Sequence, residues 1–199
     1  MSQPSTGLRS AVALVALLNL SYFAIEFLVA VRIGSASLLA DSADFFEDAA
    51  VNFLIFAALG WAAATRARVG MVLSAILLLP ALAFAWTLWQ KFAAPVPPEA
   101  LTLTATGTGA LIVNVFCAFW LARWRDHGGS LTRAAFLSAR NDAVANVGII
   151  GAGLVTHSLW RSIWPDIIVG LAIAAMNIDA ARTVWTAARD EEDELPPRA

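Results

Sequence analysis

Acidic side chains interrupt an otherwise apolar stretch of the chain near residues 36–62. Four acids fall within eight residues: Asp41, Asp44, Glu47 and Asp48. A carboxylate at the centre of a membrane helix costs at least about 2.5 kcal/mol unless it is neutralised or paired. Asp44 and Asp48 are four residues apart, so they share one helix face, and Ser37, Asp41 and Asn52 extend that face. The stretch therefore predicts a helix that places carboxylates where lipid or protein interior is expected.

A second polar stripe occurs further along the chain, within residues 133–156. Its members are spaced by four residues, with Asn141 beside them: Ser138, Asp142 and Asn146. If the two stretches cross a bilayer in opposite directions, Asp48 lies about 18 Å and Asp142 about 21 Å from the outer ends of their helices, at about 1.5 Å per residue. We therefore expect Asp44, Asp48 and Asp142 at one level near the middle of the bilayer.

Three like charges in a medium of low dielectric constant require a cation or protons. The set thus predicts a site that exchanges a divalent metal for protons. Oxygen ligands suit Mg²⁺, Mn²⁺, Fe²⁺ or Co²⁺, whereas Zn²⁺ usually prefers a nitrogen or sulfur ligand as well. Pairing with a buried arginine is the structural alternative, but Arg140 alone cannot balance three acids.

Several polar residues are candidates for the surroundings of this site or for the path of the ion. Asp41 is expected either at the outer mouth or next to the site. Glu26 belongs to a stripe with Asn19 and Tyr22 in the first apolar stretch. That stripe either borders the pathway and relays protons or makes a polar contact between helices. The set of pathway candidates is Asp41, Asn141, Asn146, Glu26 and Asn52.

The composition defines the class of protein that must hold these residues. Of the 199 residues, 59% are hydrophobic and 14% are charged, and the mean hydropathy is +0.71. A soluble chain of this length could not bury that much apolar surface, and soluble chains carry roughly 25% charged residues. The net charge of −2 argues against nucleic-acid partners. The composition therefore predicts an all-α membrane protein surrounded by lipid.

Six apolar stretches are each long enough to span a bilayer, which takes about 20 residues. They cover residues 8–30, 36–62, 69–89, 101–120, 133–156 and 166–185. Lys and Arg residues number nine on one side and three on the other, which places both termini in the cytoplasm by the positive-inside rule. We expect residues 1–189 to form a six-helix membrane domain without a soluble domain, followed by an acidic cytoplasmic tail over residues 190–199.

Three segments give the chain a specific resemblance to the cation diffusion facilitator family. Residues 34–48, GSASLLADSADFFED, resemble the family's second-helix motif, and residues 132–148, TRAAFLSARNDAVANVG, resemble its fifth-helix motif. Residues 164–171, WPDIIVGL, are similar to the start of its sixth helix. The resemblance covers nearly all of the membrane part of the chain and is carried by two motifs on the helices where the family has them.

The resemblance implies a divalent-metal efflux transporter of the bacterial inner membrane, driven by proton antiport. Zn²⁺ is the default cargo, with Mn²⁺, Fe²⁺, Co²⁺ and Cd²⁺ as others. Asp44, Asp48 and Asp142 would be ligands, and Ser138 stands where the family has a fourth ligand, His or Asp. Family members carry a C-terminal cytoplasmic domain that supports dimers. We expect this chain to be a short form without that domain, so a monomer and a homodimer are both left as alternatives.

Two other functions remain open. One is a metal-binding or partner-binding membrane subunit that does not transport, since Ser138 is a weak ligand. The other is a proton-coupled exporter of organic cations, which acids within a bundle also attract. An enzyme is not expected, because no histidine lies within a predicted span to act as a base.

Overall fold

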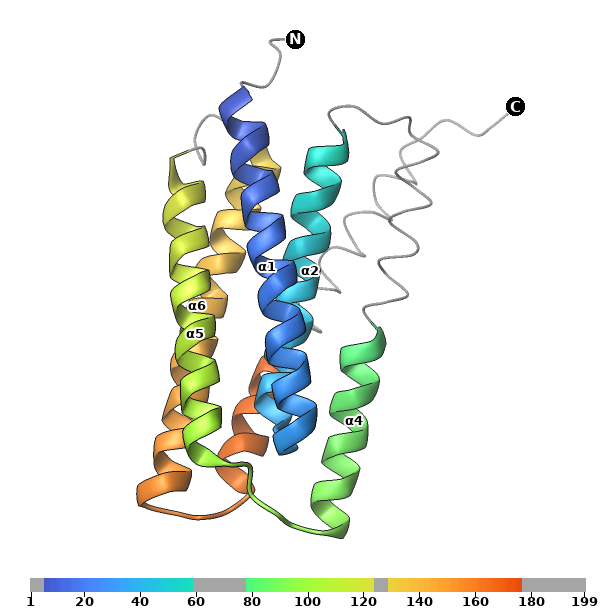
Figure 1. Ribbon diagram of the computed structural model, residues 1–199, viewed down its shortest axis with the longest axis vertical. Coiled ribbons are helices and arrows are strands. Elements are labelled where there is room, and N and C mark those ends of the chain that lie inside the picture. Colours follow the sequence, from blue (N-terminus) through green and yellow to red (C-terminus); the bar gives the residue numbers. More distant parts are fainter. Residues whose placement is uncertain (1–5, 59–77, 124–128, 177–199) are drawn as a thin grey trace, which may run out of the picture.

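The computed structural model describes residues 6–58, 78–123 and 129–176, and these residues form helices joined by short connections (Figure 1). The helices are α1 (Thr6–Ile33), α2 (Ala36–Ala58), α4 (Leu78–Ala93), α5 (Ala100–Ala122), α6 (Gly129–Ser158) and a helix over Trp164–Met176. The described residues contain no strand, so the all-α prediction is confirmed for them. Each predicted span overlaps a described helix, while residues 59–62, 69–77, 177–185 and the tail 190–199 lie outside the described part.

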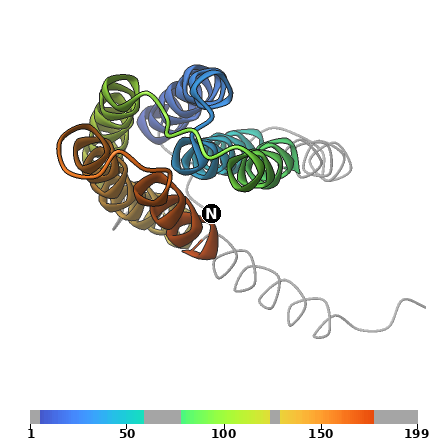
Figure 2. The ribbon, with the colours of Figure 1, turned by 90° about the horizontal axis from the view of Figure 1, so that it is seen from below.

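Two helical hairpins form the bundle (Figures 1 and 2). In one hairpin α1 packs against α2, and in the other α5 packs against α6. The hairpins meet through contacts between α1 and α5 and between α2 and α6, while α4 packs on α2. The two helices that carry the acidic motifs, α2 and α6, therefore run antiparallel and in contact, as their predicted directions require.

The connection between α1 and α2 is a two-residue turn centred on Gly34. Gly34 has φ of +64°, in the left-handed region that glycine adopts without steric cost. The Ser35 N–H donates to the Ala30 carbonyl at 2.9 Å, which closes the C-terminus of α1 in the usual glycine-ended way. This short turn fixes the position of the first residue of α2, Ala36, relative to α1.

The connection between α4 and α5 contains three prolines, which cannot continue a helix. Accordingly α4 ends at Ala93, four residues beyond the predicted end at residue 89, and α5 begins at Ala100. Glu99 caps α5, because its carboxylate accepts hydrogen bonds from the N–H groups of Leu101 at 3.1 Å and Thr102 at 2.7 Å.

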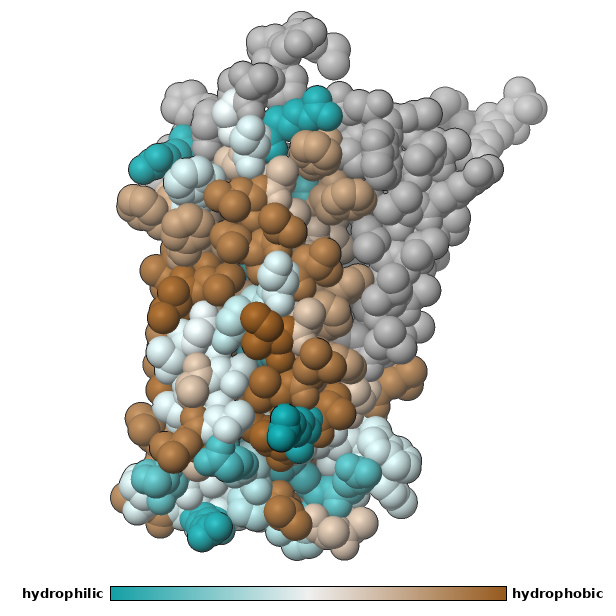
Figure 3. All heavy atoms as spheres, viewed as in Figure 1, coloured by the Kyte–Doolittle hydropathy of each residue, from teal (hydrophilic) through white to brown (hydrophobic). Residues whose placement is uncertain are grey.

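The outer faces of the helices are apolar and the interior is partly polar. Large apolar side chains such as Leu28, Ile112 and Phe119 are more than 60% exposed, whereas Glu26 and Asp41 are fully buried. Figure 3 shows hydrophobic residues over the middle of one face and hydrophilic residues toward both ends. Among the described helices, α1 and α5 are long and apolar enough by length and composition to cross a membrane. This distribution is typical of a bundle whose solvent is lipid.

Candidate cation site

The acids of α2 lie on a face that turns into the bundle. Asp41 is 0% exposed and Asp48 is 7% exposed, while Asp44 is half-buried. Asn52, one turn after Asp48, is 1% exposed, and its Nδ2 donates to the Asp48 carbonyl at 2.8 Å. The spacing of four residues therefore places these side chains along one inward stripe, as the sequence predicts.

The matching stripe on α6 also faces inward at two of its positions. Asn146 is 0% exposed and its Nδ2 donates to the Asp142 carbonyl at 2.8 Å. Asp142 is half-buried. Ser138 belongs to α6, but its side chain lies outside the described part. Asn141 is exposed and accepts a hydrogen bond from Arg140 at 3.4 Å. These two exposed side chains thus contact each other on the surface of α6.

The carboxylates of the α2 stripe and of the α6 stripe interact through their charges. Asp44 lies close enough to Asp48 and Asp142 for their charges to interact. Asp142 in turn lies close enough to Asp48 for their charges to interact, across the contact between α6 and α2. The three carboxylates of the predicted trio, Asp44, Asp48 and Asp142, therefore lie within range of one another's charge. Within the described ranges, however, no three His, Cys, Asp or Glu side chains are disposed to hold one metal ion.

Glu26 brings an acid from α1 into the same interior. Its charge interacts with those of Asp41 and Asp44, and it is 0% exposed. Among the described residues, neither the Glu26 nor the Asp41 carboxylate oxygens have a hydrogen-bond partner. Burial of an unpartnered carboxylate is expensive, so these two groups call for a compensating proton or cation.

The rest of the polar stripe on α1 makes contacts with α5. Tyr22 donates its hydroxyl to the Thr106 carbonyl at 2.6 Å, and the Cys117 thiol donates to Asn19 Oδ1 at 3.8 Å. The alternative of a polar interhelical contact is therefore found for Tyr22 and Asn19. Glu26, in contrast, turns toward the acids of α2.

An ion pair that sequence reasoning missed lies at the first turn of α2. Lys91 of α4 and Asp166, at the start of the helix Trp164–Met176, approach to 3.4 Å and are 4% and 0% exposed. Two signals were available in the sequence. Lys91 is the only lysine of the chain, and Asp166 follows Pro165 where a predicted span begins. Nothing in the sequence indicated that these residues would meet.

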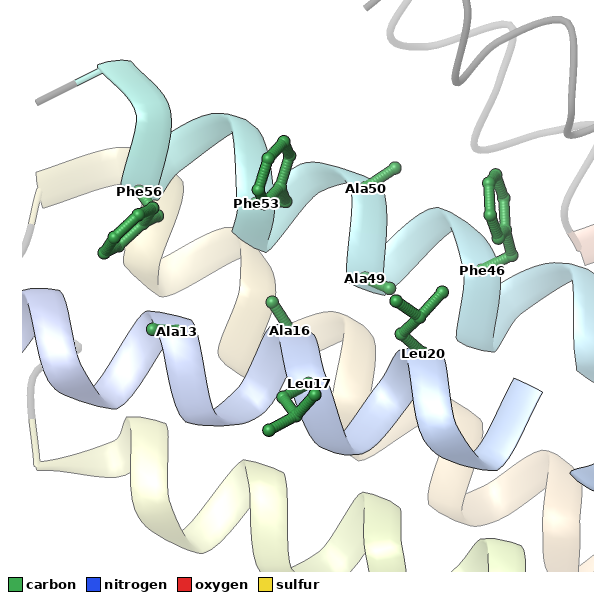
Figure 4. A pocket seen from close by; sticks show the side chains of 9 residues that line it. All are labelled: Ala13, Ala16, Leu17, Leu20, Phe46, Ala49, Ala50, Phe53 and Phe56. Carbon is green, nitrogen blue, oxygen red and sulfur yellow. The ribbon is translucent and has the colours of Figure 1, made fainter. Parts of the chain in front are cut away.

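An apolar groove lies apart from the acids. It has a volume of about 480 Å³ and lies between α1 and α2 (Figure 4), where Ala16, Leu20, Phe46 and Phe53 are among its walls. None of the described residues that line it has an ionisable side chain. The groove therefore offers no chemistry for a cation, and the acidic interior remains the candidate site.

Comparison with known proteins supports a transporter scaffold. The family described as the cation efflux transmembrane domain matches residues 12–190. The zinc transporter ZitB of Escherichia coli (strain K12) is 27% identical over 179 residues, which is 81% of this chain and 54% of that protein. ZitB of Shigella flexneri matches to the same extent. The chain thus spans about half the length of the curated relatives it matches.

Proposed function

Because the chain belongs to the cation efflux family of membrane proteins, we propose that it transports a divalent metal cation through a carboxylate site between α2 and α6. One observation carries this proposal. Asp44 and Asp48 of α2 and Asp142 of α6 lie within range of one another's charge inside an apolar bundle. Such a cluster is stable only when protons or a cation neutralise it, and a proton-coupled cation transporter needs a site that can hold either.

The proposed ligands are Asp44, Asp48 and Asp142, with the Ser138 hydroxyl in the fourth position. The proposed pathway runs past Asn52, Asn146, Asp41 and Glu26, with Asn141 at its edge. Zn²⁺ is the cargo we favour, because the matched relatives are zinc transporters. A donor set of oxygens also suits Mn²⁺, Fe²⁺ and Co²⁺, so competition among these ions and Cd²⁺ reports how strongly the site selects.

The proposed cycle couples metal export to proton import. Metal that enters from the cytoplasm displaces protons from the carboxylates, since a metal binds the deprotonated form. The hairpins then rock to open the site outward, where protons displace the metal. The proposed setting is the inner membrane of a bacterial cell, with six spans and both termini in the cytoplasm.

The experiment that tests the proposal uses the chain reconstituted in lipid vesicles. A fluorescent indicator reports Zn²⁺ flux and a pH indicator reports proton movement in the opposite direction. The proposal predicts Zn²⁺ flux that Asp48→Asn and Asp142→Asn abolish. Glu99→Gln, at the N-terminal cap of α5, should leave the flux unchanged. Zinc binding without flux would favour a non-transporting subunit. Flux of an organic cation that Zn²⁺ does not inhibit would favour the organic-cation exporter.

A further inference from the structure

Asp166 makes an unusually complete set of contacts with a helix far away in the sequence. Its Oδ1 accepts hydrogen bonds from the hydroxyls of Ser35 at 2.6 Å and Ser37 at 2.7 Å, and from the Ser37 N–H at 3.1 Å. Its Oδ2 accepts from the Ala36 N–H at 2.8 Å. Asp166 is 0% exposed, so all of these contacts are made in the protein interior.

These contacts cap α2 from outside its own hairpin. The first N–H groups of a helix lack partners within the helix, and a nearby residue in the chain usually accepts from them. Here a carboxylate about 130 residues away does so, at the helix end where the dipole favours a negative charge. Lys91 supplies the counter-charge from α4 at 3.4 Å. Three helices are therefore tied together at the first turn of α2.

Gly170 completes this anchor one helical turn after Asp166. A Cβ atom at Gly170 would lie 2.8 Å from the Ala36 carbonyl carbon and 2.9 Å from the Ser37 nitrogen. Both are backbone atoms, which cannot move aside as a flexible side chain would. Asp166 and Gly170 lie on the same helix face, so that face meets the backbone of α2 directly.

We propose that Asp166 is the positioning residue of the cation pathway: with Lys91 as its counter-charge, and with Gly170 allowing its helix to lie against the backbone of α2, it fixes the depth and rotation of α2. The inference rests on the proposed transport function. Asp44 and Asp48 follow the anchored turn on the same helix, so their placement against Asp142 depends on where that turn is held. A slip of α2 by one residue would rotate them by about 100° and shift them by about 1.5 Å.

The test measures the KM and the maximum rate for Zn²⁺ in vesicles, and Zn²⁺ binding by calorimetry on the purified chain. Asp166→Asn and Gly170→Ala are expected to raise the KM and the dissociation constant about tenfold or more, the effect usual for residues that orient metal ligands. The matched controls are Glu99→Gln, which alters a cap on α5, and Gly151→Ala, whose added methyl meets nothing within 4 Å. Both controls should stay within about twofold of the wild-type values.

A double variant separates positioning from a simple ion pair. Asp166→Ala with Lys91→Met removes both buried charges but also removes the acceptor for the N–H groups of α2. Positioning predicts that this variant keeps a raised KM. A return of the KM to the wild-type value would overturn the inference, as would unchanged constants for both Asp166→Asn and Gly170→Ala. Absence of Zn²⁺ binding by the wild-type chain would contradict the proposed function itself.

Discussion

Asn52 on α2 and Asn146 on α6 make the same hydrogen bond. In each case the Nδ2 donates at 2.8 Å to the backbone carbonyl of the acid four residues earlier, which is Asp48 for Asn52 and Asp142 for Asn146. Both asparagines are buried, and neither Oδ1 has a hydrogen-bond partner among the described residues. The two helices therefore present an equivalent Asp–Asn pair to the bundle interior.

This repeated pair predicts that both asparagines serve the site. Replacing Asn52 or Asn146 by alanine removes a side-chain hydrogen bond, which costs about 1 kcal/mol of unfolding free energy. It also removes an oxygen next to the acids, so we expect the KM for Zn²⁺ to rise about tenfold in the vesicle assay. Ser158→Ala is the control, since its exposed hydroxyl donates to the carbonyl four residues earlier at the end of α6, and its loss should leave the KM unchanged. Equal values for all three variants would contradict this role.

Replacing Ser138 by histidine should strengthen zinc binding. An imidazole nitrogen is a better zinc ligand than a hydroxyl oxygen. Competition binding should then show tighter Zn²⁺ and a larger preference for Zn²⁺ over Mn²⁺, because Mn²⁺ favours oxygen donors. An unchanged preference would indicate that position 138 lies outside the site.

Glu26 is expected to trade stability for function. Glu26→Leu replaces a fully buried carboxyl group, whose oxygens have no hydrogen-bond partner among the described residues, by an apolar side chain of similar size. We expect the unfolding free energy to rise by about 1 kcal/mol or more, as for other changes that relieve buried polar groups, and Zn²⁺-driven proton movement to fall. Thermal unfolding in detergent and the vesicle pH indicator measure the two effects. A variant that is less stable and fully active would contradict this account.

The cap of α5 should give a pH-dependent contribution to stability. Hydrogen bonding from Thr102 holds the pKa of Glu99 below its usual range. A depressed pKa means that the stabilisation is present above the unfolded-state pKa, about 4.3 for glutamate, and is lost as the pH falls through the lower folded-state value. The wild-type chain should therefore melt at a higher temperature than Glu99→Gln at pH 7, and the difference should shrink in acid. A difference that grows in acid would have the wrong sign.

The helices and the acidic stripes could be predicted because their causes are local. Apolar runs ended by Gly34 or by the prolines after Ala93 define the helices, and spacings of four place Asp44 with Asp48 on one face. The stripe of Asn19, Tyr22 and Glu26 indicated a polar face on α1, but not that Glu26 would lie near the acids of α2 while the other two contact α5. Nor could the sequence predict the contact of Asp166 with the first turn of α2, which joins residues about 130 positions apart.

The most direct test of the central claim is the amount of Zn²⁺ that the purified chain retains after equilibration and removal of free metal. Mass spectrometry of the metal content should give about one Zn²⁺ per wild-type chain, as one site of three carboxylates predicts. The Asp48→Asn and Asp142→Asn double variant should retain nearly none, while Glu99→Gln should match the wild-type chain. Equal zinc in the double variant and the wild-type chain would contradict a cation site between α2 and α6.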